Sequence, residues 1–268
     1  MNKKYEELDF IDDFLFCKIL TKNKYLCKEL LELILEIKIV DIVFSAEQKP
    51  IELTAGAKGI RLDVYVEDDV KTVYDIEMQP ITKKNLPKRS RYYQGMIDLN
   101  LIDRGADYKE LKKSFVIFIC LTDPFDKGLH IYTFENLCKQ CPDLSLGDET
   151  AKVFINAAGT TNDVSGEMKA FLDYLKGKGS TTDFTRQIEK EVNKARAHEE
   201  WRVEYMVLYM RDLDMREEGR EEGREEKRHA FVMNMLKANE PVDKICRYAE
   251  CDEAFVEKIK KELLKSKK

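Results

Sequence analysis

The chain has 268 residues, 43% of them hydrophobic, which is enough to bury the core of one large domain or of a medium domain with an appendage. Its 51 acidic and 46 basic side chains give a net charge of -5, which excludes a globally basic nucleic-acid coat protein but not a local basic patch. Because no apolar run approaches the ~18 residues of a membrane span, no secretion signal opens the chain and the seven cysteines are scattered, we expect a cytoplasmic protein with reduced thiols and no membrane partner.

The N-terminal part of the chain is predicted to be helical. Apolar residues recur at helical spacing over 12–38, with a break near 21–24. A short β-branched run follows at 39–44, and residues 48–59 are predicted to form a loop or a ragged strand.

Two strands with alternating side chains come next in the chain, over 60–67 and 71–79. Pro87 lies in the predicted first turn of a helix that runs to about Ile102. The almost unbroken apolar run at 114–121 is typical of a central strand that is covered on both faces.

The second half of the chain changes from strands to helices. Residues 130–134 and 152–155 are predicted strands, and the pattern is helical from about Val164 onward. Residues 216–227 repeat the tetrad Arg-Glu-Glu-Gly twice and end in Arg-Glu-Glu-Lys, which predicts a solvated helical spacer. Pro241 separates the two last short helices.

This order predicts an α/β protein with a helical tail. We expect one mixed domain over residues 1–160 and a helical extension over 161–268. The extension contains the charged spacer at 216–227 and a C-terminal helix pair.

Acidic side chains lie on both predicted strands, so the register of their hairpin decides whether they meet. A three-residue turn over 68–70 would pair Asp63 with Asp75, whereas a turn over 69–71 would pair it with Glu77. Either register leaves Glu77 opposite Asp63 or one diagonal step away. Two carboxylates this close repel each other unless a cation lies between them or one of them is protonated.

Two interpretations of these acids remain open. They are either solvated residues on the open face of a hairpin or ligands of a divalent cation. Mg²⁺ usually takes one or two carboxylates together with water and substrate phosphates. The second interpretation, a metal-dependent phosphodiesterase site, gains support from the next segment, because residues 80–97 contain five basic side chains and no acid.

A basic helix face therefore follows the acids. Lys88 and Arg91 lie three residues apart on one face of the predicted helix, with Lys84 just upstream. A neighbouring stripe that can pack on the sheet contains Tyr92, Met96 and Leu99. An acidic pocket followed by a basic helix suits a phosphate backbone, although a merely solvated helix face has the same pattern.

Three motifs stand in this part of the chain: Arg61-Leu-Asp63, Asp75-Ile-Glu77-Met-Gln79 and Arg89-Ser-Arg91-Tyr-Tyr-Gln94. Together they closely resemble the PD-(D/E)XK nuclease family transposases, also called recombination-promoting nucleases. The Asp-Asp-Phe-Leu-Phe segment at 12–16 and the glycine tetrads are similar to that family too. The resemblance implies a restriction-endonuclease-like core, made of a helix, a mixed sheet and a crossover helix.

The resemblance also implies an active site. Asp63 matches the metal-binding Asp of the family and Glu77 the second metal-binding acid, and the main-chain carbonyl of Met78 would complete the ligand set for one or two Mg²⁺ ions. Gln79 falls where the wider superfamily has Lys. A neutral amide there would help to position the attacking water through hydrogen bonds but supplies no charge.

The implied reaction is hydrolysis of a DNA phosphodiester, with Lys84, Lys88 and Arg91 holding the DNA backbone. Asp75 is interpreted as a simple surface acid rather than as a group behind the ligands. Asp13 is interpreted as an ordinary helix-start acid, favoured by the helix dipole, rather than as the polar residue that the first helix contributes in this superfamily.

Two functions are therefore predicted as alternatives. The first is a Mg²⁺-dependent DNA endonuclease, associated with transposition or recombination, which has DNA as its partner and could form a homodimer. The second is a DNA-binding or protein-interaction module that keeps the nuclease fold but cuts weakly or not at all, given Gln79. The C-terminal helix pair is a helix-turn-helix-like DNA reader, a dimerisation element or a cap on the core.

Overall fold

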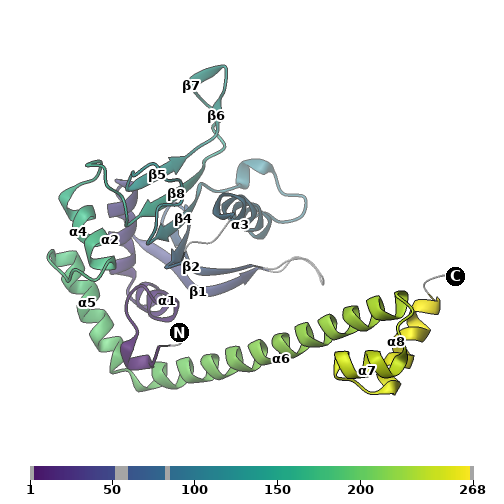
Figure 1. The fold of residues 1–268 in the computed structure, drawn as a ribbon. Coiled ribbons are helices and arrows are strands. Elements are labelled where there is room, and N and C mark those ends of the chain that lie inside the picture. Colours follow the sequence, from purple (N-terminus) through teal and green to yellow (C-terminus); the bar gives the residue numbers. More distant parts are fainter. Residues whose placement is uncertain (1–2, 52–59, 82–84, 266–268) are drawn as a thin grey trace. The chain divides into compact units, whose positions relative to one another are not determined.

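The computed structural model describes residues 3–51, 60–81 and 85–265 (Figure 1). The chain divides into two compact units, Met1–Arg202 and Val203–Lys268, and the division falls within helix α6. The boundary predicted near residue 160 stays a prediction, because a compact unit and a family domain need not end at the same residue.

The first unit contains helices and strands in the predicted order. Its helices are α1 (Asp13–Lys22), α2 (Lys24–Leu35), α3 (Leu86–Leu101), α4 (Gly166–Leu175) and α5 (Asp183–Arg196), with two 3-10 turns at Tyr5–Glu7 and Tyr108–Glu110. Its strands are β1 (Ile42–Ile51), β2 (Ile60–Asp68), β3 (Val73–Gln79), β4 (Ser114–Cys120), β5 (Ile131–Phe134), β6 (Leu137–Cys138), β7 (Cys141–Ser145) and β8 (Thr150–Asn156).

The main sheet is mixed and has six strands in the order β1-β2-β3-β4-β8-β5. The pairs β1–β2, β2–β3 and β5–β8 are antiparallel, and β3–β4 and β4–β8 are parallel. The hairpin of β2 and β3 turns over residues 69–71, since the N–H of Asp68 donates to the carbonyl of Thr72. Its ladder ends at the pair Val64–Ile76, so the observed register is the one that brings Asp63 opposite Glu77.

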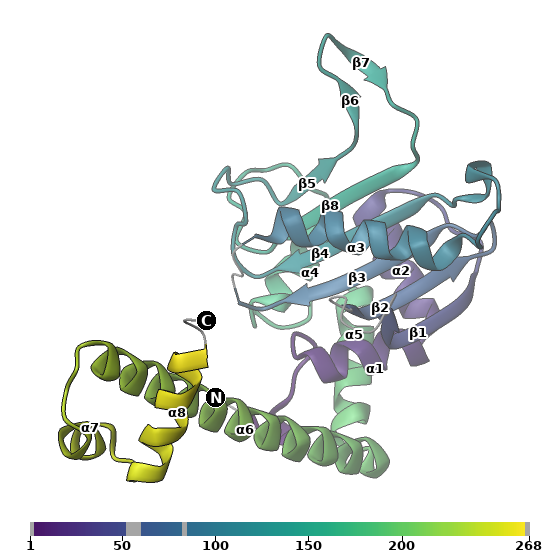
Figure 2. The same cartoon turned by 90° about the vertical axis from the view of Figure 1, so that its right-hand side faces the viewer.

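Helices cover both faces of this sheet. Helix α3 connects β3 to the parallel strand β4 and lies on one face, whereas α1 and α2 lie on the other (Figures 1 and 2). The face under α3 buries Tyr93, Met96 and Ile97 of the helix against apolar side chains of the strands, including Val116 and Phe118. This mixed sheet with a crossover helix confirms the predicted α/β class and its restriction-endonuclease-like core.

Local sequence explains where the helices begin and end. The predicted break near 21–24 is real, because the Asn23 side chain accepts a hydrogen bond from the N–H of Leu26 and caps the start of α2. Asn85 adopts a left-handed conformation with φ of 71° just before α3, and Pro87 stands in the first turn of that helix.

The segment predicted as loop or ragged strand begins as a strand: residues 48–51 belong to β1, which pairs with β2, with a positive φ of 47° at Gln48. The rest of that segment, 52–59, lies outside the described residues. One stretch differs from the sequence prediction. Strands β6 and β7, which were not predicted, form a separate two-stranded sheet (Figure 2). Both are exposed on nearly all positions, so no apolar alternation marks them in the sequence.

The second unit is helical and contains most of α6 (Glu199–Lys237), α7 (Val242–Ala249) and α8 (Glu253–Lys265). Its small core consists of Val232, Ile245, Ala249, Val256 and Ile259. The spacer at 216–227 is part of one continuous helix with the segment that precedes Pro241. The two glycines of the spacer destabilise the helix by about 1 kcal/mol each. The helix nevertheless continues through them, because helical residues on both sides remove the cost of starting a new helix. Among the described residues, no helix is both long and apolar enough to span a membrane.

Candidate functional site

The two acid-bearing strands, β2 and β3, separate at the level of Asp63. Beyond the last ladder pair, the N–H of Asp63 donates to Oε1 of Glu77 at 3.0 Å. The N–H of Met78 donates in return to Oδ2 of Asp63 at 3.2 Å. Each carboxylate therefore takes the place of a strand carbonyl as acceptor, which satisfies both N–H groups and holds the two acids close together.

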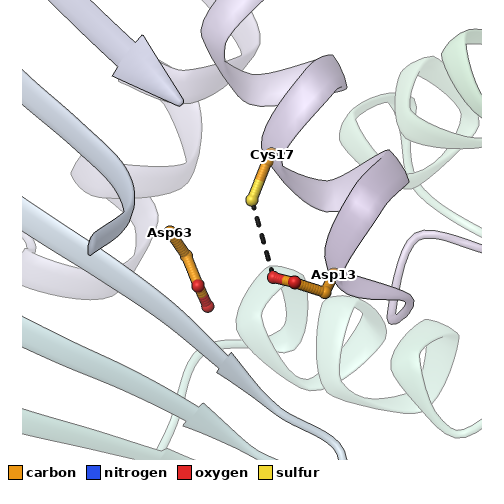
Figure 3. A group of neighbouring side chains, drawn as sticks. All are labelled: Asp13, Cys17 and Asp63. Atoms are coloured by element: carbon orange, nitrogen blue, oxygen red, sulfur yellow. Dashed lines mark hydrogen bonds between the residues drawn. The ribbon is translucent and has the colours of Figure 1, made fainter. Parts of the chain in front are cut away.

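Helix α1 brings two more side chains to Asp63 (Figure 3). Ligand atoms of Asp13, Cys17 and Asp63 all lie within 4.8 Å of one another. The Cys17 thiol donates to Oδ1 of Asp13, with a separation of 3.6 Å. Burial, followed by the charge of Asp13, raises the pKa of Cys17 well above its ordinary value, so the thiol stays protonated.

The interpretation of Asp13 as an ordinary helix-start acid is therefore incomplete. Asp13 is the first residue of α1, as predicted. It nevertheless projects toward the strand that carries Asp63, because α1 buries Leu15, Phe16 and Ile19 against the rest of the unit and so fixes which way its first turn points. The position of Asp13 depends on this packing, which the helical pattern does not specify.

The interpretation of Asp75 as a surface acid is wrong. Asp75 is completely buried on β3, and among the described residues neither of its carboxylate oxygens has a hydrogen-bond donor. Burial, then the charges of Glu77 and Asp63, raise the pKa of Asp75 well above its usual range. A protonated Asp75 can donate to the Glu77 carboxylate, so Asp75 lies behind the site rather than on the surface.

Burial and mutual repulsion also shift the two central acids. Burial, then the charge of Glu77, then that of Asp13, raise the pKa of Asp63 to about 8. Burial raises the pKa of Glu77 to about 7, even though the N–H of Asp63 and the charge of Arg89 lower it. The pocket therefore holds acidic groups whose charge Arg89 compensates only in part.

Arg89 is the basic residue that α3 brings to these acids. Its Nη2 donates to Oε2 of Glu77 at 3.3 Å and to the Tyr93 hydroxyl at 2.6 Å. Its Nη1 donates to Oε1 of Gln79 at 3.0 Å. The Gln79 amide nitrogen in turn donates to the main-chain carbonyl of Met78 at 2.9 Å.

The basic segment predicted from the sequence includes Arg89, but the binding roles were assigned to Lys84, Lys88 and Arg91, and of the stripe predicted to pack on the sheet only Met96 is buried. The predicted stripe included Tyr92 and Leu99, which are 40% and 57% exposed. The buried stripe contains Tyr93, Met96 and Ile97. Arg89 precedes Tyr93 by four residues and so lies on the buried face, a spacing that the sequence shows once the stripe is known.

A pocket of about 1060 Å³ contains Asp13, Asp63, Glu77 and Arg89 in its wall, which comes from α1, the first three strands and α3. The lining residues are Asp13, Pro50, Ile60, Arg61, Asp63, Glu77, Met78, Gln79, Asn85, Lys88, Arg89, Tyr92 and Tyr93. Of the three predicted DNA-binding residues, Lys88 lines the pocket, Arg91 is exposed outside its wall and Lys84 lies outside the described residues.

The donor set suits a hard divalent cation. Carboxylates of Asp13, Asp63 and Glu77 converge on one pocket with the Met78 carbonyl, which has a second lone pair besides the one that Gln79 occupies. A cation would offset the repulsion that raises the pKa of Asp63 and Glu77. Apart from the Cys17 thiol beside Asp13 and Asp63, the set consists of oxygen ligands, which Mg²⁺ prefers.

A family model described as PD-(D/E)XK nuclease family transposase matches residues 10–157, more than half of the chain. The matched segment runs from the residues before α1 to those after β8, and it contains every side chain that lines the pocket. No curated protein and no solved structure gives a significant match.

Proposed function

The chain belongs to the PD-(D/E)XK nuclease family transposases, and we propose that it is a Mg²⁺-dependent DNA endonuclease that acts in transposition or recombination. One observation supports this proposal beyond the family: the reciprocal hydrogen bonds that hold Asp63 and Glu77 in one pocket with Asp13. Arg89 supplies only one positive charge to these acids, so acids held this close still favour a bound divalent cation.

The proposed reaction is hydrolysis of a phosphodiester. Asp63, Glu77 and the Met78 carbonyl would hold the metal, together with Asp13. Mg²⁺ held there would supply a Lewis acid that lowers the pKa of a water and polarises the scissile phosphate. The water oxygen bonds to phosphorus as the bond to the leaving oxygen breaks; one water proton passes to solvent, and the leaving oxygen takes a proton from solvent.

The roles of the remaining predicted residues stay part of the proposal. Gln79 uses one amide N–H on the Met78 carbonyl, which leaves one N–H to position the attacking water. Lys88, in the pocket wall, would hold the DNA backbone near the acids. Arg91, which is exposed on α3, and Lys84, which lies outside the described residues, would add further contacts to the backbone.

Metal removal tests the proposal directly. We expect the purified full-length protein to nick or linearise supercoiled plasmid in Mg²⁺, to lose this activity completely in EDTA and to regain it when excess Mg²⁺ is added. Ca²⁺ has the same charge but more flexible coordination, so it is expected to support DNA binding with little cleavage. Agarose gels measure cutting, and fluorescence anisotropy measures binding.

Binding of DNA in Mg²⁺ without cutting under any condition would instead support the alternative function, a binding module with the nuclease fold. The specific observation that favours this alternative is Gln79, whose carbonyl oxygen faces Arg89 and whose side chain carries no charge. Cleavage that persists in EDTA would contradict the metal site itself.

We also propose a homodimer, located in the cytoplasm. The surface that would form it is the apolar segment of α6, which contains Val203, Met206, Val207, Leu208, Met210, Leu213 and Met215. These side chains are 36% to 62% exposed, and exposed apolar patches of this kind mark protein interfaces. Each charged tetrad that follows at 216–227 contains both signs, so the same segment of a second copy can complement it.

Replacing Met206 and Met210 together by Glu is expected to shift the protein from dimer to monomer, because it places two like charges on each side of the apolar contact. Sedimentation equilibrium of the full-length chain measures the mass. Tyr248→Glu, which changes an exposed aromatic residue on α7, is the control and should leave the mass unchanged. A parent protein that is monomeric at every concentration would contradict the proposed dimer.

A further inference from the structure

Arg89 contributes a fixed positive charge to the pocket. We infer that its guanidinium contacts the scissile phosphate and stabilises the negative charge that develops there, an inference that rests on the proposed endonuclease function. Gln79 and Tyr93 hold the guanidinium in place for this contact.

The geometry leaves Arg89 able to bind a phosphate oxygen. Among the described residues its hydrogen bonds go to Glu77, Gln79 and Tyr93, which use three of the five N–H groups of a guanidinium and leave two. The side chain is 27% exposed and lines the same pocket as the acids. Free donors at the wall of an acidic pocket are the feature that binding of a phosphodiester requires.

The surroundings of Arg89 also strengthen the interaction of its positive charge with a phosphate. The guanidinium carbon lies 5.1 Å from the centre of the Tyr93 ring and 5.5 Å from that of Phe118, so apolar groups replace water on this side. A charge acts more strongly in such surroundings than in bulk water. A group that is already held in place also needs no reorganisation when the phosphate becomes more negative.

The neighbouring candidates are less suited to this role. Gln79 is neutral and turns its carbonyl oxygen, not its amide nitrogen, toward Arg89. Lys88 lines the pocket but is exposed, so water screens its charge. Arg89 is therefore the fixed cation that the structure places beside the proposed metal ligands.

Arg89→Met tests the inference, because it removes the charge and keeps an unbranched side chain. We expect single-turnover plasmid cleavage to fall by roughly 100-fold. The affinity for Mn²⁺, measured by calorimetry without DNA, should stay the same or increase, because a cation next to Glu77 is gone. Arg104→Met, at an exposed position after α3, is the matched control and should change neither quantity.

A double variant that moves the positive charge from position 89 to position 79 tests the same role of Arg89. Gln79→Lys can bring an ammonium group to the place that the guanidinium occupied, because Gln79 contacts Arg89 directly. The double variant Arg89→Met with Gln79→Lys is expected to cleave at least ~10-fold faster than Arg89→Met alone. Thermal melting shows which variants fold; if Arg89→Met does not, Arg89→Gln replaces it in both comparisons.

The outcomes separate this inference from the function on which it rests. An inactive parent protein would overturn the proposed function and the inference with it. An active parent whose Arg89→Met variant cleaves within about threefold of it, or loses Mn²⁺ affinity in parallel with cleavage, would overturn the role of Arg89 alone. Failure of the Gln79→Lys substitution to restore any activity in a folded double variant would also count against a charge effect.

Discussion

Asp63→Asn and Glu77→Gln are each expected to reduce Mg²⁺-dependent cleavage by roughly 1,000-fold or more, the largest effects predicted for this protein. Each substitution keeps the size of the side chain and an oxygen that can accept the main-chain N–H bonded to it in the structure. It removes one negative charge from the proposed ligand set. Time courses of supercoiled plasmid in Mg²⁺ measure the loss.

Glu67→Gln is the matched control for these variants. Glu67 lies on the same strand, β2, and accepts a hydrogen bond from the Tyr65 hydroxyl at 2.7 Å, which a Gln oxygen can also accept. We expect this variant to cut DNA at the parent rate. Glu67→Gln should also bind DNA in Ca²⁺ like the parent. Equal cleavage by Asp63→Asn and the parent would contradict the assignment of the metal site.

The second large effect concerns stability and its dependence on pH. In the metal-free protein, Asp63→Asn is expected to raise the free energy of unfolding at pH 8 by on the order of 5 kcal/mol. The folded state raises the pKa of Asp63 to about 8, whereas an unfolded Asp has a pKa near 3.9. Forcing this acid to ionise in the folded protein therefore costs stability.

The sign of the pH dependence follows from proton binding. Between the unfolded pKa and the folded pKa, the folded state binds more protons than the unfolded state, so stability falls as the pH rises. The contribution of Asp63 is fully present below about pH 4 and is lost as the pH passes about 8. Glu77, with a pKa of about 7, adds a loss in the same direction.

Urea unfolding in EDTA at pH 5 and pH 8 measures this dependence. The parent should lose more stability than Asp63→Asn between the two pH values, and Mg²⁺ should stabilise the parent more at pH 8 than at pH 5, because it binds the ionised acids. Glu67→Gln, whose acid lies outside the pocket, serves again as the control. An identical pH dependence in the parent and in Asp63→Asn would contradict the raised pKa.

Much of the fold was predictable because local rules determine it. The alternation of side chains over 60–67 and 71–79 marks two strands, and the shortness of the link between them requires a hairpin. The helical spacing before Lys38 and the apolar run at 114–121 are equally local. Strands β6 and β7 were missed because they bury no face and so leave no periodic pattern.

The proximity of Asp63 and Glu77 was predictable from the amino-acid sequence, whereas their role as metal ligands stays a proposal. Three-residue turns over 68–70 and over 69–71 both bring Glu77 opposite Asp63 or one diagonal step away, so this proximity was predictable from the hairpin alone. The motif resemblance added the roles of Met78 and Gln79, which remain proposals.

The groups that surround this pair could be identified only from the packed molecule. Asp13 lies near Asp63 because α1 packs against the sheet, and Arg89 contacts Glu77 because α3 turns this side of its surface toward the strands. Asp75 is buried because α3 covers the face of the sheet on which it lies. The periods of 2 and 3.6 residues specify which side chains share a face, but not which face another element covers. That choice depends on contacts between segments far apart in the chain, and these contacts complete the site.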